Sequence, residues 1–211
     1  MEHWDQFYSK MDHVNLNKLA EPSSFAKFIL DLFPMPRFYI DIGAGNGRDS
    51  QYFMKHGNEV LSIDKSANAF LLLTNSNFEL NRQLHIELDN DFYKYKNLFN
   101  IIDKENVKHN YHRIFYCRFF LHTLNPKLKL YFINNITIGM RTGDIIAFEN
   151  RIEQDKKYFF GNHERFPIAN HELKKLFPNE NFKIIYDEES FEFANFDFEN
   201  PLIGRIIFEK I

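Results

Sequence analysis

One acid and three glycines in the first third of the chain have the spacing of a nucleotide-binding loop. Gly43, Gly45 and Gly47 alternate directly after the apolar run 38–42, and a helical pattern follows them. Glycines let the backbone pass close beneath a ligand, and the first N–H groups of a helix point toward whatever the loop holds. Asp64 ends the next apolar run, at the position where nucleotide-binding α/β folds bind a ribose. We therefore predict a cofactor that carries adenosine.

The spacing of these glycines differs from the dinucleotide fingerprint. That fingerprint is G-x-G-x-x-G, and its third glycine lets helix and strand pack closely around a pyrophosphate. Here the third glycine, Gly47, comes one residue earlier, and Asp41 stands two residues before the first glycine. The spacing therefore makes a nicotinamide-dependent dehydrogenase a less favoured interpretation than a protein that binds another adenosine-bearing cofactor.

Cations and histidines follow two later apolar runs. Arg118 stands in an apolar run where an unpaired guanidinium would be costly, and His122 follows it by four residues. Arg151, His163 and Arg165 come after the next run. Because the chain has a net charge of −3 and still gathers cations here, we expect them to bind an anionic substrate. The alternatives are a core histidine and an ordinary charged loop.

The expected elements bring both groups to one edge of a sheet. Strands are expected at 38–42, 59–63, 83–88, 113–119, 145–148, 182–186 and 203–209, and helices at 25–32, 49–54, 66–73, 126–136 and 170–177, the last capped by Asn170. Residues 93–110 carry no assignment. Alternating helices and short apolar strands predict an α/β fold, a mostly parallel, doubly wound sheet with helices on both faces. Ligands bind beyond the carboxyl ends of the strands in such sheets, where both groups lie.

The bulk properties narrow the class of protein. A length of 211 residues suits one domain, and the net charge of −3 gives no general attraction to nucleic acid or to an anionic membrane. A single cysteine, Cys117, excludes a disulfide framework, and the acids are too scattered to indicate a metal site. The first residues lack a signal region, and no apolar run is long enough to span a bilayer. We expect a cytoplasmic protein that binds neither metal, membrane nor nucleic acid.

The segment Asp41-x-Gly43-x-Gly45-x-Gly47 resembles motif I of the class I S-adenosylmethionine methyltransferases. The resemblance implies a Rossmann-like fold whose last two strands form an antiparallel hairpin at the sheet edge. It also implies S-adenosylmethionine as the cofactor and S-adenosylhomocysteine as its product.

Roles for individual residues follow from this resemblance. It implies that Asp41 lies close to the methionyl amino group and that Asp64 holds both ribose hydroxyls. After the third strand, Asp91 with Phe92 is expected at the adenine, and Asp89 is the competing acid. The cofactor site is expected to contain Tyr8, Asp41, Gly43, Ala44, Gly45, Arg48, Asp49, Asp64, Lys65, Asp91, Phe92 and Arg118.

Further segments are similar to a narrower group, the small-molecule methyltransferases encoded with bacterial surface-polysaccharide genes, including those linked to O-methyl phosphoramidate decoration of capsules. They are Trp4-Asp5-x-Phe7-Tyr8, the segment 21–26, Arg118-Phe119-x-x-His122, Glu149-x-Arg151-x-x-x-Asp155, His163-x-Arg165 and the segment 200–205. This resemblance implies a helical arm at 1–22 before a methyltransferase domain at 23–211. The substrate site is expected to contain Arg118, His122, Glu149, Arg151, His163 and Arg165. Glu164 stands where that group has an aromatic residue, so the substrate's identity stays open.

The expected reaction is methyl transfer to a small metabolite that carries a phosphate or phosphoramidate group. An ionised acceptor oxygen needs no strong base, whereas a hydroxyl or ammonium acceptor does, and His122 and His163 are then the candidate catalytic residues. The alternatives are O-methylation of a sugar hydroxyl or another small molecule, methylation of a metalloid oxyanion, and a protein that binds S-adenosylmethionine without transferring its methyl group. Whether the arm is a lid or a packed structural helix also stays open.

Overall fold

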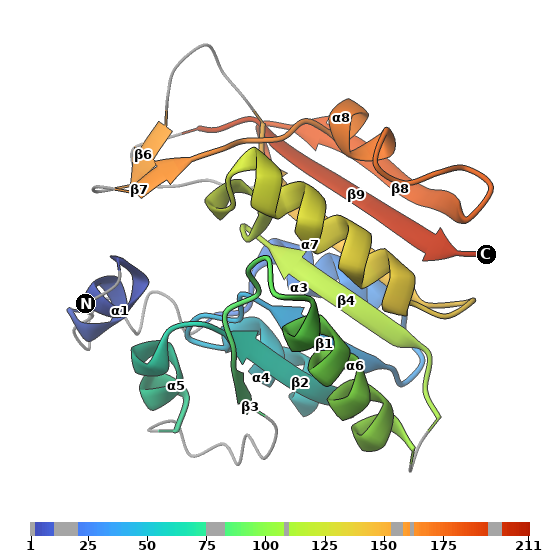
Figure 1. Cartoon of the computed structure of the whole chain (residues 1–211), viewed down its shortest axis with the longest axis horizontal. Helices are drawn as coiled ribbons and strands as arrows, with labels where there is room; N and C mark the ends of the chain where they lie inside the picture. The colour runs from blue at the N-terminus through green and yellow to red at the C-terminus, as the bar shows by residue number, and fades with distance from the viewer. Residues whose placement is uncertain are drawn as a thin grey trace.

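A seven-stranded sheet forms the centre of the molecule (Figure 1). The computed structural model describes residues 3–10, 21–74, 83–107, 110–152, 158–160, 163–193 and 200–211. The strands of this sheet are β1 (Phe38–Ile42), β2 (Glu59–Asp64), β3 (Gln83–His85), β4 (Arg113–Arg118), β5 (Ile145–Arg151), β8 (Phe182–Ser190) and β9 (Ile203–Lys210). Their order is β3-β2-β1-β4-β5-β9-β8. The first five strands pair in parallel, and β9 is antiparallel to both β5 and β8.

Helices cover both faces of the sheet. They are α1 (His3–Ser9), α3 (Ser24–Leu32), α4 (Arg48–Lys55), α5 (Ala67–Thr74), α6 (Phe92–Asn106), α7 (Pro126–Gly139) and α8 (Asn170–Lys174), with the short 3-10 helix η1 (Leu121–Thr123). A small antiparallel hairpin joins β6 (Tyr158–Phe160) and β7 (His163–Arg165). Figure 1 shows α6 and α7 in front of the sheet and α3 and α4 behind it.

The alternation of side chains along β1 explains this layering. Successive residues of a strand point to opposite faces of the sheet. Phe38 and Ile40 join the apolar cluster that contains Phe132 of α7. Tyr39 points the other way and stacks on Phe53 of α4, with the two ring centroids 4.0 Å apart. All five residues of β1 are buried, which places this strand in the middle of the core.

The predicted fold class is confirmed, and several elements differ in extent from the expected ranges: α7 ends at Gly139, α8 ends at Lys174 and β8 continues through Ser190. β3 ends at His85, earlier than the strand expected at 83–88, and β5 continues through Arg151. α6 forms where no element was assigned. Asp91 caps it, because the Asp91 carboxylate accepts a hydrogen bond from the backbone N–H of Tyr93 at 2.9 Å, and the helix buries Leu98.

The prediction that Asn170 caps the following helix is wrong. Asn170 is the first residue of α8, and Ala169 precedes it at the N-cap position, with its backbone N–H donating to the Glu172 carboxylate at 3.0 Å. The Asn170 side chain instead donates to the Asp187 carboxylate at 2.9 Å and to the backbone oxygen of Arg205 at 3.1 Å. It therefore ties α8 to β8 and β9.

The N-terminal helix α1 and the β6–β7 hairpin lie beyond the carboxyl ends of the parallel strands (Figure 1). α1 is anchored beside α5, because Ser66 Oγ donates to the Asp5 carboxylate at 2.6 Å and Asn68 Nδ2 donates to the Asp5 backbone oxygen at 3.1 Å. Of the arm predicted at 1–22, residues 1, 2 and 11–20 lie outside the described residues. None of the described helices combines the length and the apolar character that a membrane crossing requires.

Candidate functional site

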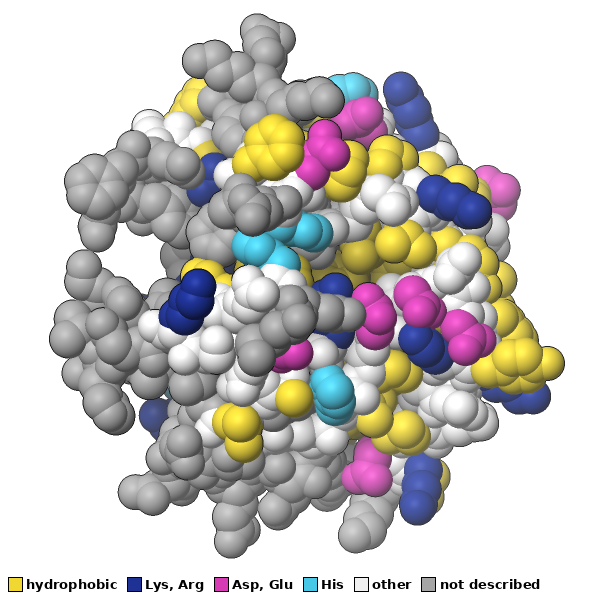
Figure 2. Space-filling model, turned by 60° about the vertical axis from the view of Figure 1, so that its left-hand side comes forward, with side chains coloured by type: hydrophobic (Ala, Val, Ile, Leu, Met, Phe, Trp, Pro, Cys, Tyr) yellow, Lys and Arg dark blue, Asp and Glu magenta, His cyan; other side chains and the backbone are white. Residues whose placement is uncertain are grey.

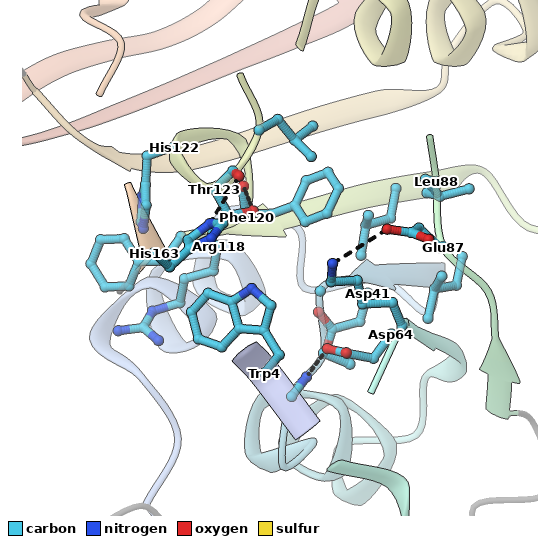
Figure 3. Close-up of a pocket in the computed structure, with 18 of the residues that line it drawn as sticks. Trp4, Asp41, Asp64, Glu87, Leu88, Arg118, Phe120, His122, Thr123 and His163 are labelled. Atoms are coloured by element: carbon cyan, nitrogen blue, oxygen red, sulfur yellow. Dashed lines mark hydrogen bonds and ion pairs between the residues drawn. The ribbon is translucent and has the colours of Figure 1, made fainter. Parts of the chain in front are cut away.

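A cavity of about 880 Å³ lies at the carboxyl ends of the parallel strands. Its walls come from α1, from the loops after β1, β2, β3 and β4, and from the β6–β7 hairpin. Figure 2 shows this end of the molecule, with histidine side chains near the middle of the face. In Figure 3, Asp41 and Asp64 lie on one side of the cavity and Arg118, His122 and His163 on the other. The cavity therefore has an acidic end and a cationic end.

Glycine backbone forms the floor of the acidic end. Gly43 and Gly45 have φ angles of +77° and +56°, which residues with a side chain rarely adopt. A Cβ atom on Gly43 would lie 2.9 Å from the Phe120 ring, and one on Gly45 would collide with the Tyr8 hydroxyl. The predicted glycine loop thus lines the cavity as bare backbone, and Tyr8 lies directly against it.

Asp64 is fixed at the edge of this loop. Its Oδ2 accepts a hydrogen bond from the Gly45 N–H at 2.8 Å, and its Oδ1 accepts one from the Ser66 N–H at 2.8 Å. Because each carboxylate oxygen has two acceptor positions, both oxygens can still accept from a ligand. Burial raises the pKa of Asp64 above its usual value. The side chain is therefore held in place and retains acceptor positions on both oxygens.

Asp41 lies deeper at the same end. It is only 3% exposed, and Ser50 Oγ donates to its Oδ2 at 2.6 Å. The pKa of Asp41 is raised to about 7: burial is the largest cause, the nearby carboxylates of Asp49 and Asp64 act in the same direction, and the Ser50 hydrogen bond and the Arg118 guanidinium act against them. Near neutral pH this carboxyl group can therefore be protonated or ionised, and a cation beside it would favour the ionised form.

The residues after β3 differ from those that the sequence indicated. Asp91 and Phe92 are exposed at the start of α6 and do not line the cavity. The cavity is lined instead by Ile86, Glu87, Leu88 and Asp89. The reason is that β3 ends at His85, so the carboxyl edge of the sheet is reached three residues earlier than the expected strand implied. Asp89, the competing acid, is at the wall.

The remaining residues expected at the cofactor lie close by. Ala44, Arg48 and Lys65 line the cavity. Asp49 also lines it, but its carboxylate accepts hydrogen bonds from the Ser23 backbone N–H at 2.7 Å, the Ser23 hydroxyl at 2.7 Å and the Tyr116 hydroxyl at 2.8 Å. Asp49 therefore fixes the start of α4 against the segment that precedes α3.

Three arginines define the cationic end. Arg118, Arg151 and Arg165 all line the cavity, from β4, β5 and β7. Glu149, expected to bind substrate, does not line it: the side chain is fully buried, and its carboxylate pairs with Arg118 at 2.8 Å and Arg205 at 2.7 Å. Glu149 therefore supports the arginine at the wall.

Two histidines complete this end. His122 is 2% exposed, and its Nδ1 has no hydrogen-bond partner within the described part of the chain. Burial lowers the pKa of His122 well below its usual value, and the nearby Arg165 and Arg151 lower it further, so the ring is neutral. His163 Nε2 lies 3.2 Å from the backbone oxygen of Thr123.

α1 reaches this cationic end as well. The rings of His3 and His163 stack with their centroids 5.2 Å apart, and Trp4 meets His163 edge-on at 5.7 Å. Sequence patterns identified Trp4 only as part of an arm and did not indicate that His163 would be its partner. α1 therefore spans the cavity from Asp5, beside α5, to the β6–β7 hairpin.

Comparisons with known proteins identify the fold. No protein-family model matches the chain, and no curated protein matches it. Among solved structures, a S-adenosylmethionine-dependent methyltransferase from Anabaena variabilis aligns with a TM-score of 0.66 at 15% identity, over 99% of this chain and 93% of that one. The N-methyltransferase NodS from Bradyrhizobium japonicum, in complex with S-adenosylhomocysteine, aligns with a TM-score of 0.65 at 9% identity, over 99% of each chain. The chain has a Rossmann-like methyltransferase fold.

TehB from Haemophilus influenzae shares this fold, with a TM-score of 0.64 at 17% identity. The alignment covers 89% of this chain but 62% of TehB, so the chain spans less than two thirds of that protein.

Proposed function

We propose that the protein is a cytoplasmic, S-adenosylmethionine-dependent methyltransferase that acts on a small anionic metabolite with a phosphate or phosphoramidate group. The observation that carries the proposal is a single cavity that joins a glycine floor and two carboxylates at one end to three arginines at the other. The fold, which S-adenosylmethionine-dependent methyltransferases share, supports the same assignment.

The acidic end suits the cofactor. Asp64 can accept from both hydroxyls of a ribose, since neither oxygen uses all of its acceptor capacity. Asp41 offers a buried carboxylate to a cationic amino group, and ionisation of Asp41 compensates the ligand's charge. The glycine floor allows close approach, because a Cβ at Gly43 or Gly45 would fill space that their neighbours already occupy.

The cationic end suits an anionic acceptor. Arg118, Arg151 and Arg165 can hold phosphate oxygens and fix the direction in which one of them points. S-adenosylmethionine supplies a methyl group on a sulfonium, which is already activated for transfer. The arginines therefore contribute mainly orientation, and the aromatic wall around Trp4 and Phe120 contributes exclusion of water.

An acceptor that must lose a proton is the second candidate, and His122 favours it. Its Nδ1 is buried, carries no partner among the described residues and belongs to a neutral ring at the cavity wall. Such a nitrogen can accept a proton from a sugar hydroxyl or an ammonium group. The further expectation, that the product enters capsule or surface-polysaccharide synthesis, stays a prediction of the sequence resemblance.

Two measurements test the proposal. Calorimetry should give tight binding of S-adenosylmethionine and S-adenosylhomocysteine and none of NAD. A methyl-transfer screen should then give turnover with phosphorylated small molecules. Turnover with sugars or free amines alone would contradict the anionic acceptor, and tight cofactor binding without any turnover would indicate a binding protein.

A further inference from the structure

Three charged side chains lie next to one another across β4, β5 and β9. Arg118 is the register partner of Glu149, and Glu149 is the register partner of Arg205, so all three lie on one face of the sheet. Glu149 is fully buried and Arg205 is 5% exposed, whereas Arg118 lines the cavity. A row of charges therefore leads from the interior of the sheet to the cavity wall.

The two oxygens of Glu149 are divided between the two arginines. Oε2 accepts a hydrogen bond from Nε of Arg205 at 2.7 Å, and Nη2 of Arg205 lies 2.7 Å from the same oxygen as an ion pair. Oε1 accepts from Nε of Arg118 at 2.8 Å. Arginine and carboxylate frequently pair through two parallel hydrogen bonds, yet Arg118 uses only its Nε here. Across the part of the chain that the structure describes, no residue accepts a hydrogen bond from the two terminal nitrogens of Arg118.

Both arginines are held in these positions by further contacts. Arg205 Nη2 donates to Ser24 Oγ at 2.7 Å, and the Arg205 guanidinium lies 4.1 Å from the centroid of the Phe193 ring. The guanidinium of Arg118 lies 4.5 Å from the centroid of the Phe119 ring. Arg205 is thus fixed at the second oxygen of Glu149 and cannot drift from it without losing several contacts.

We propose that Arg205 is a positioning residue that keeps the terminal nitrogens of Arg118 directed into the cavity by occupying the second oxygen of Glu149. If that oxygen were vacant, Arg118 would turn to pair with both oxygens of Glu149, and its terminal N–H groups would leave the cavity. The inference rests on the proposed function for its ligand: these groups bind the carboxylate of the cofactor or the anionic group of the acceptor.

Crystal structures of full-length Arg205→Met and of the unsubstituted protein test the geometry. The variant should show Arg118 bonded to both oxygens of Glu149. Calorimetry with S-adenosylhomocysteine and, separately, with inorganic phosphate should show that the affinity for at least one of them falls about tenfold. Arg113→Met is the matched control, because Arg113 is 1% exposed and pairs with buried Asp144 at the other end of β4. Arg113→Met should lower the thermal stability about as much as Arg205→Met does. It should leave the contacts of Arg118 and the affinities for both probes unchanged.

Each outcome separates the two proposals. If Oε2 is vacant and Arg118 still contacts Glu149 through Nε alone, or if affinity falls equally in Arg113→Met, the positioning role is wrong. If Arg205→Met does not fold, a crystal structure of Arg205→Lys tests the same inference. Where the lysine ammonium occupies Oε2 of Glu149, Arg118 should contact Glu149 through Oε1 alone. Where Oε2 is vacant, Arg118 should contact both oxygens. If the unsubstituted protein binds neither probe, the proposed function fails, while the contacts of Arg118 in the crystals still decide the inference.

Discussion

The acidic end of the cavity, at β1 and β2, and its cationic end, at β4 and β5, hold their charges in different ways. Asp64 accepts from the backbone of Gly45, 19 residues away in the same strand–loop–helix–strand unit. Arg118 is held by Glu149, 31 residues away, and Glu149 by Arg205, a further 56 residues along the chain. One end is therefore a local structure, whereas the other is assembled from three strands that meet only in the folded sheet.

This difference separates what each end is expected to control. The acidic end consists of backbone groups and carboxylates from one short segment, so few of its residues can change without loss of the site. Such a site suits a cofactor that stays the same. The assembled end depends on side chains from several strands and a hairpin, and such positions can change one at a time to suit another acceptor. Substitutions at the acidic end should therefore affect cofactor affinity, and substitutions of Arg151 or Arg165 at the cationic end should affect the KM for the acceptor.

The largest effect is expected from Asp64→Asn. The substitution keeps the shape of the side chain but replaces the carboxylate that we propose for the two ribose hydroxyls by an amide that offers one oxygen. It also brings an NH₂ group against a backbone N–H of Gly45 or Ser66. The affinity for S-adenosylhomocysteine should fall about 100-fold, measured by calorimetry.

Glu87→Gln is the control for this substitution. Glu87 also lines the acidic end and carries the same charge, but it is exposed and pairs with Lys65 at 3.3 Å. Its removal should change the affinity by less than about threefold, because exposed ion pairs contribute little. Equal losses in the two variants would mean that net charge, rather than the fixed position of Asp64, governs binding.

The next effect tests the other end. Arg165→Gln removes a cation from the wall near His122, and the KM for the anionic acceptor should rise about tenfold or more while the affinity for S-adenosylhomocysteine stays constant. Steady-state kinetics with the acceptor found in the screen measure this. Lys65→Gln removes a cation from the acidic end and should leave the KM for the acceptor unchanged. A rise in that KM in both variants would show that the two ends do not act separately.

The same contrast between a local and an assembled end explains which parts of the site could be predicted from the sequence. Asp41, Gly43, Gly45 and Asp64 lie in one strand–loop–helix–strand unit, and the structure places all four at the cavity. Local patterns also indicated β1, β2 and β4. The pairing between β2 and β3 ends at His85, and this contact between strands decides where β3 ends. The cavity is therefore lined by residues 86–89 rather than by Asp91.

Contacts between distant residues could not be predicted from local patterns. The fully buried state of Glu149 follows from its position between β4 and β9, and nothing in the segment Glu149-x-Arg151 distinguishes a carboxylate that binds substrate from one that holds Arg118. The stacking of His3 on His163 likewise joins opposite parts of the chain. Residue types pointed to the right region, and the sheet topology decided which side chains reach the cavity.

A smaller effect concerns the pH dependence of cofactor binding. Because the pKa of Asp41 is raised to about 7, its carboxyl group is mostly protonated at pH 6 and mostly ionised at pH 8. The ionised form attracts the amino group of S-adenosylhomocysteine, so affinity should increase about tenfold over this range. Calorimetry across pH measures it, and Asp41→Asn should bind more weakly at pH 8 without this dependence. An unchanged slope in the variant would assign the titration to another group.

The smallest effect is expected from His122→Gln, and it decides between the two acceptor classes. Burial lowers the pKa of His122 well below its usual value, so the ring is already neutral but accepts a proton only weakly near neutral pH. A general base works best when its pKa lies close to the working pH, and its loss typically costs about 100-fold or more in kcat. With an ionised phosphate-type acceptor no proton is removed, so kcat should fall by less than about threefold and the pH profile should keep its shape.

The matched comparison is His163→Gln. In the unsubstituted protein the Nε2 atom of His163 lies 3.2 Å from the Thr123 carbonyl oxygen, and the loss of this ring should have a similarly small effect on kcat. A loss of about 100-fold in His122→Gln alone, with activity shifted to more basic pH, would instead show that the acceptor carries a proton and that the assembled end of the cavity removes it.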